Sequence, residues 1–81
     1  MNIEKIVYQA LMEVINNFNK TKKISIVTKE IGDWKLKIIK YHSFTKDMLM
    51  NIKDKKELGI KENEEYLIIP EHQVVCIMSK K

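Results

Sequence analysis

The fold is decided by residues 23–38, which have the sequence KISIVTKEIGDWKLKI. The first half alternates and is rich in β-branched residues, as half-buried strands are. Gly32-Asp33 is a turn signal, and after it lysines alternate with large apolar residues. The stretch therefore predicts a β-hairpin.

The second strand of this hairpin has an apolar side and a basic side. Trp34, Leu36 and Ile38 share one side, while Lys35 and Lys37 share the other. Successive side chains of a strand point to opposite faces of its sheet. We expect the apolar side to face the core and the two lysines to face solvent, or the phosphates of a ligand.

Residues 3–18 predict an amphipathic helix. Asn2 can cap its start, and cations from Lys20 onward suit its C-terminal end. Apolar residues recur at helical spacing and form one wide face: Ile3, Ile6, Val7, Ala10, Leu11, Val14, Ile15 and Phe18.

The remaining chain predicts a short helix and a second hairpin. Residues 45–52 suit either a helix capped by Thr45 or a short strand. Asp54 begins a capping-box pattern, and Gly59 suits a left-handed helix end. A last hairpin should pair residues 65–69 with residues 73–79.

These elements make one domain, residues 1–81. We predict an α+β fold, with the N-terminal amphipathic helix packed on a small, mainly antiparallel sheet. Along the chain the order is helix, strand, strand, short helix, strand, strand. The 44% of apolar and 32% of charged residues are typical of a globular domain.

Charge divides the chain into a basic body and an acidic segment. Residues 1–56 hold twelve lysines and six acidic residues, a net charge of +6, whereas residues 57–81 have a net charge of −2. All fifteen basic residues are Lys. Without the planar fork of Arg, bidentate reading of guanine is disfavoured, but lysines can bind phosphates regardless of sequence.

The scarcity of cysteine, histidine and glycine indicates the cellular compartment of the protein and limits its chemistry. Cys76 is the only cysteine, so no intramolecular disulfide can form, and neither a signal peptide nor an apolar run that spans a bilayer is apparent. We expect a cytoplasmic protein without a membrane partner. His42, His72 and Cys76 are too few and too dispersed for a metal centre, and the two glycines form no phosphate loop. We expect no enzyme, no metal and no cofactor.

Two clusters are candidate binding sites. Lysines on and after the second strand could contact phosphates: Lys35, Lys37, Lys40, Lys53, Lys55 and Lys56. Acidic residues before and at the start of the third strand could bind a basic protein: Glu62, Glu64 and Glu65. The alternative for both clusters is an ordinary solvated surface.

Residues 40–77 resemble the swapped-hairpin AbrB/MazE/SpoVT family. The similarity lies in residues 56–69, KELGIKENEEYLII, and residues 73–77, QVVCI. In that family a short helix ends in Leu-Gly-Ile, an acidic turn follows, and two strands close the unit. The resemblance implies an intertwined homodimer that binds DNA as a regulator or antitoxin. The family's Gly-Arg and Ile-Pro steps have no counterpart in residues 46–53.

The chain also resembles Sm-like RNA-binding proteins. An N-terminal helix leads into residues 24–27, ISIV, then Gly32, residues 35–39, KLKII, and a last strand after Pro70. This resemblance implies a ring that binds uridine-rich RNA. The Asp and Asn expected after the second strand are replaced by residues 42–45, HSFT.

The function expected from the sequence is a small, non-enzymatic regulatory module. It would self-associate and bind nucleic acid, or a nucleoprotein, through its lysine-rich surface. The alternative is an inhibitor from a phage or mobile element that blocks a host protein such as a defence nuclease, as anti-CRISPR proteins do.

Overall fold

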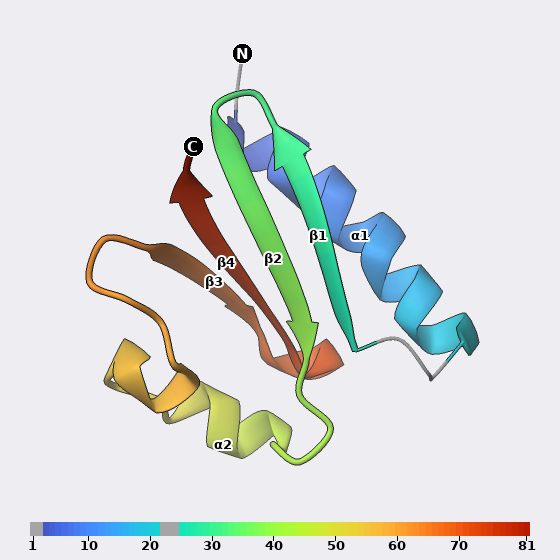
Figure 1. Cartoon of the computed structure of the whole chain (residues 1–81). Helices are drawn as coiled ribbons and strands as arrows, with labels where there is room; N and C mark the ends of the chain where they lie inside the picture. The colour runs from blue at the N-terminus through green and yellow to red at the C-terminus, as the bar shows by residue number, and fades with distance from the viewer. Residues whose placement is uncertain (1–2, 22–24) are drawn as a thin grey trace.

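A long helix packs against an antiparallel sheet in the computed structural model, which describes residues 3–21 and 25–81 (Figure 1). The long helix is α1 (Ile3–Thr21). The strands are β1 (Ile26–Ile31), β2 (Trp34–Lys40), β3 (Glu65–Ile69) and β4 (Val74–Lys80). Short helical segments lie between β2 and β4: α2 (Lys46–Met50), η1 (Lys55–Leu58) and η2 (Pro70–His72). The predicted α+β class is confirmed, and the two 3₁₀ segments η1 and η2 add detail to the predicted order.

The last strand lies inside the sheet rather than at its edge. The strand order is β1-β2-β4-β3, and all neighbours are antiparallel. Both predicted hairpins are present, β1 with β2 and β3 with β4. They are joined because β4 also pairs with β2, in a register that sets Ile38 opposite Cys76. The two edge strands are therefore β1 and β3.

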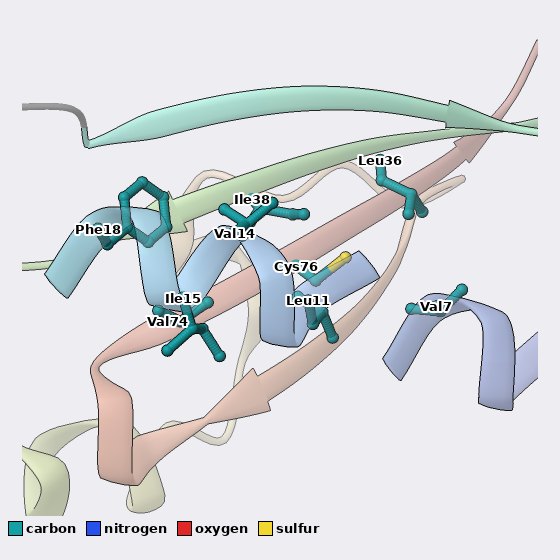
Figure 2. Packing of buried hydrophobic residues seen from close by; sticks show 9 residues of the cluster. All are labelled: Val7, Leu11, Val14, Ile15, Phe18, Leu36, Ile38, Val74 and Cys76. Carbon is teal, nitrogen blue, oxygen red and sulfur yellow. The ribbon is translucent and has the colours of Figure 1, made fainter. Parts of the chain in front are cut away.

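One face of the sheet is covered by α1, and we call it the α1 face. The helix places the apolar stripe predicted from its spacing against Leu36 and Ile38 of β2 and Val74 and Cys76 of β4 (Figure 2). The helical residues of this cluster are Val7, Leu11, Val14, Ile15 and Phe18, all buried. The predicted cap Asn2 lies outside the described residues.

The opposite face, which we call the α2 face, is covered in part by the segment that contains α2 and η1. Leu49 of α2 is 1% exposed and packs with Leu58 and Ile60 on Val75 and Ile77 of β4. Strand β4 is thus buried on both faces. This explains why residues 74–77 are apolar without alternation, a pattern typical of a central strand.

Local signals set the ends of the short helices. Residues 46–50 are helical, so the helix interpretation of residues 45–52 is the one realised, and the Thr45 hydroxyl accepts a hydrogen bond from the Met48 N–H at 3.2 Å. The Asp54 carboxylate caps η1 by accepting from the Lys56 N–H at 2.9 Å, one residue earlier than a capping box places this bond. Gly59 ends η1 with φ +72°, the left-handed conformation that favours glycine.

Candidate nucleic-acid interface

The α2 face is covered at one end and open at the other. Strand register defines rows of side chains that run across all four strands. In the row that contains Ile39, Val75 and Ile68, the side chains pack against the α2 and η1 layer. The next two rows contain Lys37 and Lys35. Ile77 of the Lys37 row still packs against the layer, but on β1 and β2 both rows carry exposed polar side chains.

These open rows form a shallow depression of about 300 Å³, which we call the lysine hollow. Its lining combines two ammonium groups, two hydroxyls, a carboxylate and an apolar floor: Lys35, Lys37, Thr28, Ser79, Glu64 and Ile77. Thr28 is paired with Lys37 across β1 and β2, and Lys35 with Ser79 across β2 and β4. Both lysines are exposed, as the alternation of β2 predicts.

The two lysines of the hollow are unpaired. In the described part of the chain, neither Lys35 nor Lys37 has an ion pair or a side-chain hydrogen bond. Glu30 is opposite Lys35 in the register, but its carboxylate is 3.0 Å from the Lys81 ammonium group. Glu64 accepts a hydrogen bond from the Lys61 N–H at 2.9 Å. The ammonium groups of Lys35 and Lys37 are therefore free to bind an external anion.

Two of the other candidate lysines are engaged within the fold. The Lys40 ammonium group donates to the main-chain carbonyl of His72 at 2.6 Å. By alternation Lys40 also belongs to the α1 face, with Leu36 and Ile38, rather than to the α2 face. The Lys55 ammonium group donates to the carbonyls of Glu62 at 2.8 Å and Glu64 at 3.2 Å, which holds the loop before β3. Neither group is free to bind a ligand while these bonds are made.

The last two candidate lysines lie outside the hollow. Lys53 follows α2, Lys56 is in η1, and both are exposed. They belong to the layer that covers the other half of the α2 face and do not line the hollow. The fold therefore divides the six candidate lysines into three pairs. Two line the hollow, two donate hydrogen bonds within the fold, and two are exposed on the covering layer: Lys35 and Lys37, Lys40 and Lys55, and Lys53 and Lys56.

The three candidate acidic residues do not form one surface. Glu64 lines the lysine hollow, whereas Glu65 belongs to the α1 face, opposite Met78, and lines a groove there. Glu62 is exposed in the preceding turn. Because consecutive strand residues point to opposite sides, Glu64 and Glu65 cannot bind one flat partner surface together.

The groove on the α1 face was not predicted from the sequence. It has a volume of about 560 Å³ and lies between the start of α1, β2 and the β3 edge. Its lining is mainly apolar and aromatic: Val7, Tyr8, Trp34, Glu65, Tyr66, Leu67 and Met78. Tyr8 is 58% exposed and Leu67 is 40% exposed. One feature of the sequence could have indicated this groove: the aromatic residue Tyr8 lies next to the apolar stripe of residues 3–18.

The remaining polar chemistry is sparse. Cys76 is buried in the α1 cluster, and burial raises the pKa of its thiol to about 11. His42 lies in the turn after β2, with its Nε2 atom 3.2 Å from the Ser25 hydroxyl. Across residues 3–21 and 25–81, no three His, Cys, Asp or Glu side chains come together in a group that could hold a metal ion. In the same ranges no helix is long and apolar enough to cross a membrane.

Comparisons with known proteins give no relative. No protein-family model, no curated protein and no solved structure matches this chain. The resemblances to the AbrB/MazE/SpoVT family and to Sm-like proteins stay predictions.

Proposed function

We propose that the protein is a small, non-enzymatic regulatory module that binds nucleic acid through the lysine hollow. The observation that supports this most strongly is the pair of exposed, unpaired ammonium groups of Lys35 and Lys37 on an open sheet face. Lysines bind phosphates as point charges, in a manner that depends on salt and not on base sequence. The Thr28 and Ser79 hydroxyls beside them can donate hydrogen bonds to phosphate oxygens.

The test is affinity for mixed-sequence DNA and RNA, measured by fluorescence anisotropy over a salt series. We expect binding at low salt that weakens as salt rises, and a loss in the double variant Lys35→Gln, Lys37→Gln. Lys29→Gln is the matched control, because Lys29 is also exposed on the sheet but pairs with Leu36 and so points to the α1 face. No binding at low salt, or equal losses in the control, would refute the proposal.

The proposal includes self-association, which would take place through the edge strand β3. Edge strands expose unpaired backbone groups, and charged residues on them normally hinder pairing with other chains. The β1 edge carries Lys29 and Glu30, whereas β3 carries one charge, on its first residue Glu65, and residues 66–69 are uncharged. With Tyr66 and Leu67 partly exposed on it, β3 is the edge at which two copies would pair.

A second candidate function is binding and blocking a host protein, such as a defence nuclease, without enzymatic activity. The apolar groove on the α1 face favours it, since exposed apolar surface next to an open strand edge often marks a protein-binding site. The test is capture of a partner from host lysate with and without nuclease treatment. Binding that survives nuclease digestion and is lost in Leu67→Lys or Glu65→Lys would favour this function over nucleic-acid binding.

A further inference from the structure

From the charges that surround the lysine hollow, we infer that its ligand is a single-stranded nucleic acid and not a duplex. The inference rests on the proposed function and adds the class of ligand. It depends on how wide the basic strip is, and on which groups border it.

The basic strip is about one strand wide. Lys35 and Lys37 lie on the same strand, two residues and therefore roughly 7 Å apart. The row through Lys35 runs from Glu30 on β1 through Ser79 on β4 to Glu64, just before β3. Three strand spacings separate the two carboxylate-bearing positions, or roughly 14 Å. Glu64 borders the strip on the β3 side, whereas on the β1 side the Glu30 carboxylate forms an ion pair with the Lys81 ammonium group at 3.0 Å.

Such a strip suits one phosphodiester chain that follows β2. A duplex presents two chains, separated by a major groove about 12 Å wide or a minor groove about 6 Å wide. With one chain over Lys35 and Lys37, a second chain displaced towards β3 would pass over Glu64, two strand spacings or roughly 10 Å from Lys35. Repulsion by the Glu64 carboxylate opposes such a second chain more than it opposes a single strand that follows β2. The α2 and η1 layer also rises at one end of the hollow and limits the approach of a wide ligand.

An aromatic side chain lies where an unpaired base can reach it. The row through Lys37 continues across Ile77 to Tyr66 on β3, and this places Tyr66 on the same face as the lysine. Tyr66 is 36% exposed, lies two strand spacings or roughly 10 Å from Lys37, and lines the groove on the α1 face rather than the hollow itself. Stacking of bases on aromatic side chains is a general feature of single-strand recognition, and a duplex offers no unstacked base for it.

The experiment compares one labelled mixed-sequence oligonucleotide, alone and annealed to its complement, at a fixed low salt concentration. We expect the single strand to bind at least about fivefold more tightly, because one base stack alone is worth that much. Its affinity should fall with salt with a logarithmic slope of about −1.4, the value for two phosphate contacts on a single strand. Lys35→Gln or Lys37→Gln should each reduce that slope by about half.

Two variants separate the causes of the preference. Tyr66→Leu keeps an apolar residue on the edge strand, and we expect it to weaken single-strand binding several-fold without changing the salt slope. Glu64→Gln removes the acidic border, and we expect it to strengthen duplex binding more than single-strand binding. Polyphosphate offers phosphates without bases, so it should bind equally to the chain and to Tyr66→Leu.

The outcomes distinguish this inference from the proposed function. Equal or tighter duplex binding that still depends on Lys35 and Lys37 would overturn the single-strand inference and leave the proposed function standing. Single-strand preference that is unchanged in Tyr66→Leu and in Glu64→Gln would overturn it too. Absence of binding to either form would refute both.

Discussion

The ammonium group of Lys40 donates a hydrogen bond to the main-chain carbonyl of His72 at 2.6 Å, across 32 residues of sequence. It ties the end of β2 to the turn η2 between β3 and β4. In the same region the Tyr41 N–H donates to the Gln73 carbonyl at 2.8 Å. Lys40, which the sequence suggests as a phosphate ligand, is thus a structural residue. Along β2, substitution of Lys40 should therefore change stability, whereas substitution of Lys35 or Lys37 should change binding.

We therefore expect opposite effects from Lys40→Met and Lys35→Met. Lys40→Met keeps the aliphatic stem but removes the bond to His72, and should lower the free energy of unfolding by about 1 kcal/mol, since the site is only half-buried. Lys35→Met should leave stability within about 0.5 kcal/mol and weaken nucleic-acid binding. Urea denaturation and anisotropy titration of both variants check this. If the same variant showed the larger loss in both stability and nucleic-acid binding, this expectation would be contradicted.

Gly59 should be needed for its backbone conformation alone. Its φ is +72°, and a Cβ atom added there would meet nothing within 4 Å. Gly59→Ala should therefore cost about 1 kcal/mol through the left-handed backbone, without a steric clash. Gly59→Asn should cost less, because asparagine tolerates this conformation. Thermal and urea unfolding measure both, and a cost for Asn equal to that for Ala would show that another effect dominates.

Cys76 should make stability fall at high pH. Burial favours the neutral thiol and raises its pKa from 9.0 to about 11 in the folded chain. Between pH 9 and pH 11 the unfolded chain loses the thiol proton while the folded chain keeps it. The unfolded state then binds fewer protons, so the free energy of unfolding decreases as pH rises through this window.

The matched variant for this effect is Cys76→Ala. Burial also raises the pKa of Tyr41, so part of the alkaline loss should persist in the variant. Urea unfolding of both chains at a series of pH values gives the difference that belongs to Cys76. In the folded protein at pH 8, the thiol should also resist alkylation until denaturant is added. Rapid alkylation without denaturant would contradict the burial of Cys76.

The α2 layer should stabilise the fold through Leu49. Leu49 is 1% exposed in the cluster on the α2 face, whereas its neighbour Met48 is 50% exposed. We expect Leu49→Ala to cost about 3 kcal/mol and Met48→Ala less than about 0.5 kcal/mol. Trp34 fluorescence monitors the α1 face and far-ultraviolet circular dichroism the whole chain. Coincident transitions would show that both layers unfold together, and a separate Leu49-dependent transition would show that they do not.

The β3 edge should control self-association. Leu67 is 40% exposed on this edge strand, whose residues 66–69 are uncharged. Leu67→Lys places a charge where two copies would pair, so it should shift the chain towards monomer with little loss of stability. Analytical ultracentrifugation over a concentration range measures the shift. Thr28→Lys, on the β1 edge, is the control; an equal effect there would indicate repulsion by net charge rather than pairing through β3.

Local pattern was enough to predict the elements of this protein. A helix is recognised by a period of 3.6 residues, as in Val7, Leu11 and Val14, and a strand by a period of 2, as in Leu36 and Lys37. Both periods can be detected within a short stretch of sequence. The Thr45 cap and the left-handed Gly59 are also local, because each concerns a residue and the turn beside it. For the same reason the exposed side of β2 could be identified from the sequence alone.

Only the tertiary structure decided which of these residues act together. The pairing of β4 with β2 joins positions about 40 residues apart, and no local period encodes it. That pairing places Ser79 beside Lys35, and the turn η2 brings the His72 carbonyl within reach of Lys40. A lysine side chain is long and flexible, so the nearest acceptor after folding determines whether its charge is free. Sequence alone thus determined where Lys35 and Lys37 face, and the fold determined which of the candidate lysines remain available.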